Sequence, residues 1–157
     1  MSLTVASQPA ATDFFYEVYA GTRRDEVAAW GWGTAEQEAF LRLQFDLQQR
    51  AYSLQYPGAD HGVILHDGRP VGRLIVDRTG SEMHLIDLAL LPAHRNAGLG
   101  AVLIRLLQAE AAEKARPIRL QVMKGNPARR LYERLGFGLA GESETHVALV
   151  WRPEGPG

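Results

Sequence analysis

Apolar residues recur at three- and four-residue spacing in three stretches of the chain, which predicts three amphipathic helices. The first stretch opens at Thr34-Ala35-Glu36-Gln37, which has the spacing of a capping box, and ends before Pro57-Gly58. The second starts near Leu99 and carries charged and amide side chains on its other side. The third is short, with Asn126 as its predicted N-cap and Gly136 as the left-handed residue that ends it.

In other stretches apolar and polar residues alternate, or nearly every residue is apolar, and these stretches are predicted to be strands. Residues 62–65 and 71–76 form a predicted hairpin, because Asp67-Gly68 between them suits a tight turn with positive φ. Residues 83–91 are apolar at nearly every position, as in a central strand that is covered on both faces. Further strands are predicted at residues 14–19, 118–123 and 145–151, with a short helix around 25–32. The expected order is strand, helices, three strands, helix, strand, helix and strand, which is an α/β (α+β) chain.

The chain has 157 residues, so residues 1–157 are predicted to form a single domain, with flexible tails at 1–11 and 153–157. The net charge of −1 argues against a nucleic-acid binder, although Arg129, Arg130 and Arg134 lie close together. Without cysteine, the chain can form no disulfide, thiolate metal site or cysteine nucleophile. No apolar run reaches the ~18 residues of a membrane helix, so a cytoplasmic protein without membrane partners is expected.

The loop Pro92–Gly100 joins the apolar strand to the second helix and contains two glycines. Free N–H groups at the start of a helix attract anions, and Gly98 and Gly100 would let an anion approach the backbone. A dinucleotide fingerprint is excluded because Leu103 stands at its third glycine position, and a P-loop is excluded because Ala101 follows Gly100. The residues by themselves leave two interpretations, a phosphate-binding loop or a plain turn between strand and helix.

Two motifs resemble those of the GCN5-related N-acetyltransferase (GNAT) family. Arg95-x-x-Gly98-x-Gly100 is similar to the R/Q-x-x-G-x-G/A loop of that family, and Leu88–Pro92 is similar to the strand that precedes it. The segment Asn126–Phe137 is similar to the family's N-x-x-A-x-x-L-Y-x-x-x-G-F segment. The resemblance covers about residues 62–150, and it departs from the family at Asn96-Ala97, where many members carry glycine and a basic residue.

The resemblance implies a mixed, mainly antiparallel sheet that is flanked by helices and splayed between its fourth and fifth strands. It also implies acetyl-coenzyme A as the cosubstrate and no metal. The pantetheine arm would pair with the fourth strand, and the pyrophosphate would bind the amides of the glycine loop. Asn126 would bind the cofactor arm, cap its helix, or do both, and Arg129 and Arg130 would touch the 3′-phosphate or remain solvated. The implied cofactor-binding residues are Leu88, Ala89, Leu90, Arg95, Asn96, Ala97, Gly98, Leu99, Gly100, Asn126 and Arg129.

The implied reaction moves an acetyl group from acetyl-coenzyme A directly to a primary amine of a small molecule or peptide, in a ternary complex. Tyr132 matches the tyrosine that commonly protonates the departing thiolate in this family, and packing in the core is its structural alternative. Three residues on or just before the strand 83–91 are candidate bases for the amine: Glu82, His84 and Asp87. Asp87 stands among apolar neighbours, so it needs a partner, a neutral state or a function. A structural partner for Asp87, and a water chain in place of any base, stay open.

Five aromatic residues fall in the segment that usually shapes the acceptor site in this family, although they could equally belong to the core. They are Trp30, Trp32, Phe40, Tyr52 and Tyr56. The acceptor stays unidentified, and a homodimer is left open. The alternative to an active enzyme is a catalytically weak acyl-coenzyme A-binding module with a sensory or regulatory role.

Overall fold

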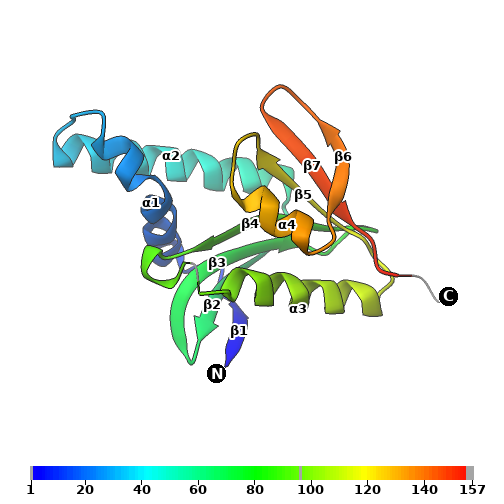
Figure 1. Cartoon of the computed structure of the whole chain (residues 1–157). Helices are drawn as coiled ribbons and strands as arrows, with labels where there is room; N and C mark the ends of the chain where they lie inside the picture. Colours follow the sequence, from blue (N-terminus) through cyan, green and yellow to red (C-terminus); the bar gives the residue numbers. More distant parts are fainter. Residues whose placement is uncertain (1, 96, 155–157) are drawn as a thin grey trace. The chain divides into compact units, whose positions relative to one another are not determined.

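The computed structural model describes residues 2–95 and 97–154 (Figure 1). The helices are α1 (Thr12–Ala28), α2 (Thr34–Gln55), α3 (Leu99–Glu113), α4 (Ala128–Arg134) and the short 3-10 helix η1 (Pro92–His94). The strands are β1 (Leu3–Ser7), β2 (Asp60–His66), β3 (Arg69–Asp77), β4 (Met83–Leu90), β5 (Ile118–Met123), β6 (Gly138–Glu142) and β7 (His146–Trp151). None of the helices in the described ranges is long and apolar enough to cross a membrane.

The strands form one sheet in the order β1-β2-β3-β4-β5-β7-β6. The pairs β1–β2, β5–β7 and β6–β7 are antiparallel, whereas β4 and β5 run parallel. The parallel ladder joins Met83–Leu85 to Ile118–Leu120, which are the first three residues of each strand. The predicted fold class, a mixed and mainly antiparallel sheet with helices, is confirmed.

The chain folds into two compact units. The first consists of the residues up to Leu74 together with Leu88–Arg95, and the second consists of Ile75–Asp87 and the residues after Arg95. Strands β3 and β4 each begin in one unit and end in the other. The single domain expected over residues 1–157 stays a prediction.

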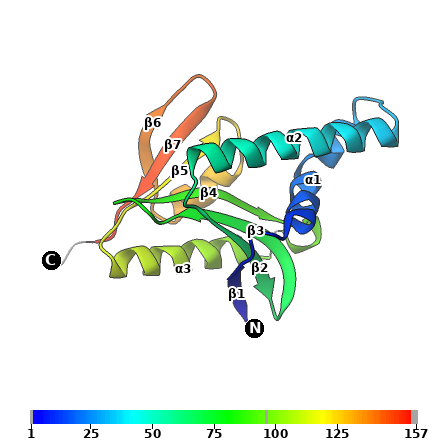
Figure 2. The ribbon, with the colours of Figure 1, turned by 180° about the vertical axis from the view of Figure 1, so that it is seen from behind.

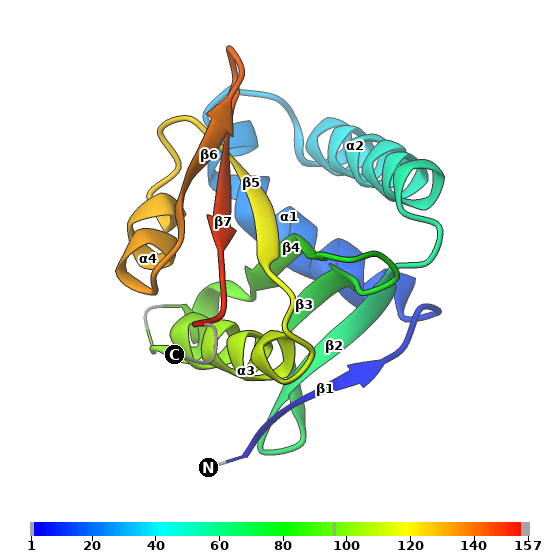
Figure 3. The ribbon, with the colours of Figure 1, turned by 90° about the vertical axis from the view of Figure 1, so that its right-hand side faces the viewer.

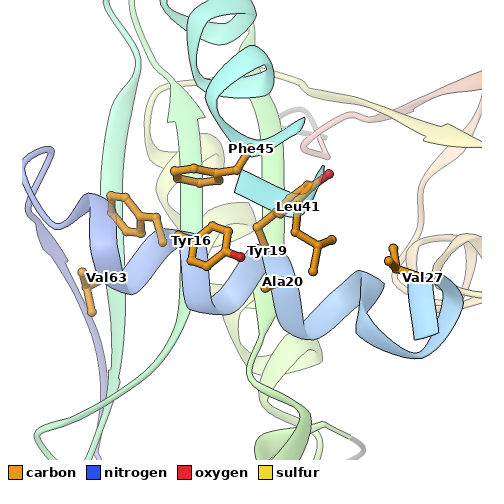
Figure 4. Packing of buried hydrophobic residues seen from close by; sticks show 8 residues of the cluster. Tyr16, Tyr19, Ala20, Val27, Leu41, Phe45 and Val63 are labelled. Carbon is orange, nitrogen blue, oxygen red and sulfur yellow. The ribbon is translucent and has the colours of Figure 1, made fainter. Parts of the chain in front are cut away.

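In the first unit, α1 and α2 form a helical hairpin (Figure 2) with an aromatic core between them. The ring of Phe45 on α2 lies 5.7 Å from the ring of Tyr16 and 5.8 Å from that of Tyr19, centroid to centroid. Figure 4 shows these rings gathered with Leu41 where the two helices face each other. The first contact is edge-on and the second is tilted, and aromatic pairs of this kind add stability beyond the apolar area that they bury. The buried members of the cluster are Phe15, Tyr16, Tyr19, Ala20, Val27, Leu41, Phe45 and Val63.

In the second unit, β5, β7 and β6 lie side by side (Figure 3), and polar contacts fasten α3. The guanidinium of Arg78, just after β3, donates to both carboxylate oxygens of Glu110 at 2.6 and 3.1 Å. The side chain of Gln108 donates from Nε2 to the carbonyl oxygen of Leu135, the residue after α4, at 2.7 Å. Helices α3 and α4, which carry the two motifs, are therefore held in a fixed relation.

Residues 14–19 are helical rather than extended, so the strand predicted there is wrong. Aromatic and β-branched residues favour strands, but Phe15, Tyr16 and Tyr19 are buried at helical spacing along α1. Helix α1 also takes in the first residues of the short helix expected around 25–32. Burial against α2 therefore overrides the local strand preference.

Two edge strands are absent from the sequence prediction. Residues Leu3–Ser7, expected to be part of a flexible tail, form β1 and pair with Gly62–His66 of β2, so the tail prediction is wrong for them. The tail at 153–157 lies outside the described residues beyond Glu154. Strand β6 is exposed along its whole length and pairs with β7. It was not predicted because its sequence contains two glycines and lacks the apolar pattern of a strand.

The turn and cap predictions are mostly confirmed. Asp67 and Gly68 have φ of 52° and 81°, as the tight turn between β2 and β3 requires. The capping box is wrong, because Gly33 is the N-cap of α2 and Gln37 donates from Nε2 to the carbonyl oxygen of Trp32 at 2.7 Å. Gly136 has φ of 97°, the left-handed conformation predicted for the residue that ends α4.

Candidate active site

Helix α3 begins at an open, left-handed glycine. Gly98 is its N-cap, with φ of 78° and ψ of 3°, and no side chain caps the helix there. A Cβ atom built on Gly98 would meet nothing within 4 Å, so the backbone at this point faces open space. The buried side chain of Leu99 anchors the first turn of the helix. A helix start with free amides and an unobstructed approach suits an anionic group such as a phosphate.

The second glycine of the motif lies against α4. A Cβ atom on Gly100 would stand 3.5 Å from Cδ2 of Leu131, which is an ordinary van der Waals distance. Ala97 is exposed in the bend before Gly98, and Asn96 lies outside the described residues. The predicted contacts of Asn96 to Gly100 with a pyrophosphate stay predictions.

The end of β4 and the start of the loop belong to the first unit. The N–H of Leu91 donates to the carbonyl oxygen of Val71 on β3 at 2.8 Å, and a Cβ atom on Gly72 would overlap the carbonyl oxygen of Ala89. The guanidinium Nε of Arg95 donates back to the carbonyl oxygen of Leu90 at 3.2 Å. In this arrangement Arg95 fastens the turn after β4. The expected pairing of Leu88, Ala89 and Leu90 with a pantetheine arm stays a prediction.

Tyr132 on α4 is held by the turn that ends its helix. The N–H of Phe137 donates to the carbonyl oxygen of Tyr132, and the N–H of Gly136 donates to that of Glu133, both at 3.1 Å. This is the Schellman pattern, which needs a left-handed residue at Gly136 and usually brings together the two apolar side chains at its ends. The rings of Tyr132 and Phe137 indeed lie 5.7 Å apart at an interplanar angle of 61°. The Gly-Phe pair therefore fixes both the backbone and the ring of Tyr132.

The phenol of Tyr132 is protonated across the physiological pH range. Its side chain is buried, at 7% exposure, and burial raises the pKa of Tyr132 to about 12, with a further contribution from the negative charge of Asp87. A neutral phenol in a buried position can donate a hydrogen bond to a group that gains negative charge. The structure thus brings together two of the predicted catalytic residues, Tyr132 and Asp87.

The other two candidate bases lie toward the start of β4 and have different neighbours. The carboxylate of Glu82 accepts a hydrogen bond from Nε of Arg119 at 3.3 Å, and both side chains are about one-third exposed. His84 stands opposite Arg119 in the parallel ladder, and it lies near Asp77, whose pKa is lowered mainly by hydrogen bonds from Thr79, with a smaller contribution from His84. Side chains alternate across a strand, so Asp87 shares a face of β4 with the buried Leu85 rather than with His84.

The asparagine of the second motif lies just before α4. The N-cap of α4 is Pro127 rather than the predicted Asn126, but Oδ1 of Asn126 accepts a hydrogen bond from the N–H of Ala128, the first residue of the helix, at 2.9 Å. The predicted contact of Asn126 with the cofactor arm stays a prediction. Arg129 forms an ion pair with Glu133 on the same helix, at 3.4 Å, which gives it a structural partner.

Sequence reasoning did not assign a role to Phe137, which closes the turn and packs on Tyr132. The sequence carried a signal for it, because an apolar residue directly after a C-terminal glycine is typical of a Schellman ending.

Of the five aromatic residues considered for the acceptor site, three contact one another: Trp30, Trp32 and Phe40, with ring centroids 5.2 to 5.5 Å apart. Within residues 2–95 and 97–154, no cluster of three or more His, Asp or Glu could hold a metal ion.

Comparisons with known proteins agree on one family. Residues 13–137 match the acetyltransferase (GNAT) family. A [ribosomal protein bS18]-alanine N-acetyltransferase of Haemophilus influenzae is 25% identical over 139 residues, which cover 86% of this chain and 82% of the relative. The PaiA N-acetyltransferase of Thermoplasma acidophilum, solved in complex with coenzyme A, is 16% identical with a TM-score of 0.69, over 97% of this chain and 99% of that one.

The ribosomal-protein-S18-alanine N-acetyltransferase of Escherichia coli gives a TM-score of 0.62 at 18% identity, over 99% of this chain and 97% of that one. At such low identities the two solved structures show the fold alone. Membership of the family rests on the family match, which covers most of the chain. The match includes both the glycine loop before α3 and the segment that ends in Gly136-Phe137. This chain belongs to the GNAT family and is an acetyl-coenzyme A-dependent acetyltransferase.

Proposed function

We propose that this acetyltransferase moves the acetyl group directly to a primary amine of a small molecule or peptide, within a ternary complex. The observation that carries the proposal is the buried side chain of Tyr132 on a helix whose ending fixes its ring. In the reaction the amine nitrogen bonds to the acetyl carbonyl carbon, the carbon–sulfur bond breaks, and the sulfur leaves as a thiolate. The amine nitrogen gives up a proton, and the thiolate finally takes one.

Tyr132 stabilises the leaving sulfur. With a pKa of about 12, its phenol is a weaker acid than an ordinary thiol, whose pKa is about 8.5. Complete transfer of its proton to the sulfur is therefore uphill by about 5 kcal/mol. The phenol instead donates a hydrogen bond that strengthens as negative charge develops on the sulfur, so the interaction stabilises the transition state more than the bound substrate.

The start of α3 is proposed to hold the phosphates of the cosubstrate. Gly98 supplies the left-handed turn that frees the first amides of the helix, and the open space beside it admits the phosphate. Because Arg129 is already paired with Glu133, the backbone rather than that guanidinium is expected to provide most of the affinity.

Asp87 is proposed as the group that receives the proton of the amine, directly or through a water molecule. It is the candidate base whose charge reaches Tyr132, so it lies near the group that faces the leaving sulfur. Glu82, whose carboxylate accepts a hydrogen bond from Arg119, is kept as the second candidate. A carboxylate is a weak base, however, so an amine with a low pKa is the acceptor that it can serve best.

The α-amino group of a peptide fits this requirement. Its pKa of about 7.7–8.0 lies well below that of a lysine side chain, which costs about 3–4 kcal/mol more to deprotonate. The Haemophilus influenzae relative is named for an alanine of ribosomal protein bS18, and the only amine that alanine can offer is its α-amino group. We therefore rank peptide α-amines above lysine side chains as acceptors.

The experiment compares acceptors and then variants. The protein is incubated with acetyl-coenzyme A and one of three amines: a lysine-free peptide that begins with alanine, a peptide with a blocked N-terminus and one lysine, or a small primary amine. Thiol release and the mass of the peptide report acetylation. We expect acetylation, with the alanine peptide fastest. Release of thiol without acetylated amine in all three reactions would contradict direct transfer.

The same assay on Asp87→Asn and Glu82→Gln tests the base. Removal of a general base typically costs a hundredfold or more, so we expect Asp87→Asn to lower kcat by about that factor while Glu82→Gln stays within about threefold of the wild type. Melting curves confirm that both variants fold. A larger loss in Glu82→Gln than in Asp87→Asn would contradict the assignment.

A further inference from the structure

Helix α2 carries an apolar face in addition to the one that it buries. Leu41 and Phe45 pack into the core of the first unit, whereas Leu43, Leu47 and Leu54 are 56%, 49% and 81% exposed. These exposed residues belong to a stripe whose members alternate at four- and three-residue steps along the helix. The α2 stripe consists of Glu36, Phe40, Leu43, Leu47, Arg50 and Leu54.

Two tryptophans extend the stripe beyond the start of the helix. Trp30 and Trp32 are 43% and 41% exposed, and both contact Phe40 edge-on. Each tryptophan exposes about 100 Å², at roughly two-fifths of a ring system of about 250 Å². The three exposed leucines add on the order of 200 Å² of apolar surface. A monomer rarely leaves an apolar surface of this extent uncovered unless it serves an interaction.

We propose that the α2 stripe binds the α2 stripe of a second copy of this chain, with the two helices antiparallel about a two-fold axis at Leu43. The charges at the two ends of the stripe support this register. In it, Glu36 of one copy stands level with Arg50 of the other, so one arrangement forms two ion pairs. Within one helix the two residues are about 21 Å apart and cannot reach each other.

The apolar residues agree with the same register. Phe40 of one copy lies within one residue of the level of Leu47 in the other, and Leu54 stands near the start of the other α2, which Trp32 directly precedes, so the exposed leucines come near aromatic rings. Neither Glu36 nor Arg50 has an ion pair inside the chain, as far as the structure describes it. The apolar groups of both copies together supply about 800 Å², and the flanking polar residues bring the contact near the ~1,000 Å² that a specific interface needs. Apolar residues spaced alternately four and three positions apart are also typical of helices that pair in coiled coils.

The test measures the mass of the full chain by light scattering at protein concentrations from about 1 to 200 µM. We expect the wild type to be a dimer at the upper concentrations. Leu43→Asp places two carboxylates at the two-fold axis, so it should weaken the dimer by about a hundredfold or more. Leu106→Asp is the matched control: this leucine of α3 is 50% exposed and lies outside the α2 stripe, so that variant should dimerise like the wild type.

A mixing experiment tests the register itself. Glu36→Arg and Arg50→Glu should each weaken the homodimer, because each sets like charges level with each other. Mixed together, the two variants restore both ion pairs, so a heterodimer should form, most clearly at low salt. A helix dipole that merely prefers Glu36 near one end and Arg50 near the other predicts no such rescue.

Three results would overturn the proposal. One is a wild type that stays monomeric up to 200 µM, in which case the surface serves another partner. Another is a dimer that survives Leu43→Asp in a folded protein. The third is a mixture of the two charge variants that associates no better than either variant alone.

Discussion

Replacement of Gly100 by alanine should separate folding from cosubstrate binding. Gly100 lies in the first turn of α3, and the added methyl would meet only Leu131 Cδ2, at 3.5 Å. The methyl therefore fits without a shift of its neighbours. Because glycine lowers helix stability by about 0.5–1 kcal/mol relative to alanine, Gly100→Ala should leave the free protein as stable as the wild type or raise its Tm by about 1–4 °C.

The same methyl should weaken the binding of coenzyme A. If the phosphates lie against the first amides of α3, a methyl at Gly100 occupies space that they need. A tenfold loss of affinity, about 1.4 kcal/mol, is a conservative expectation. Gly98→Ala should behave differently, because its methyl meets nothing within 4 Å but φ of 78° costs about 1–2 kcal/mol for any residue with a Cβ atom. That variant should lose stability as well as affinity.

Isothermal titration of coenzyme A and melting curves on the same samples provide the assay. Arg130→Ala serves as the control, since it removes a nearby charge without changing the backbone, and it should weaken binding less than either glycine variant. A folded Gly100→Ala protein that binds coenzyme A as tightly as the wild type would refute the reasoning. So would an Arg130→Ala protein that binds more weakly than both glycine variants.

Two further outcomes follow from the site. Acetyl-coenzyme A at about a hundred times its Kd should stabilise the fold by about 2.7 kcal/mol, a rise in Tm of about 5–10 °C, and the absence of any shift at saturation would argue against the site at α3. The phenol of Tyr132 has a pKa of about 12 in the folded chain but of about 10 in the unfolded chain. Its contribution to the free energy of unfolding is therefore complete below pH 10 and is lost as the pH rises to 12. Denaturant titrations should show the wild type losing about 3 kcal/mol more than Tyr132→Phe over this range, and parallel losses would mean that the phenol is not buried.

The sequence predicted the parts of the fold that local chemistry determines. Asp67, Gly68 and Gly136 are residue types that tolerate positive φ, and their positions predicted the turn after β2 and the end of α4. The apolar spacing likewise predicted α2, α3 and α4. The elements that failed depend on partners distant in the sequence: residues 14–19 become helical against α2, and β1 is a strand because β2 is beside it.

The candidate site shows the same division. The glycine loop and Tyr132 were recognisable because their motifs are local in the sequence. The proposed choice among Glu82, His84 and Asp87 could not be made from the sequence, because it depends on which groups the fold brings near: Arg119 beside Glu82, and Tyr132 near Asp87. The self-complementary charges on α2 could likewise not be recognised from the sequence. They are visible only once it is known which face of the helix is buried and which is exposed.

Steady-state kinetics of Tyr132→Phe test the central claim most directly. The substitution keeps the ring and its contact with Phe137, so the fold and the KM for acetyl-coenzyme A should change little. Loss of the hydrogen bond to the leaving sulfur should lower kcat by about a hundredfold or more, under conditions where the chemical step limits the rate. A Tyr132→Phe protein with the turnover of the wild type under those conditions would contradict the account.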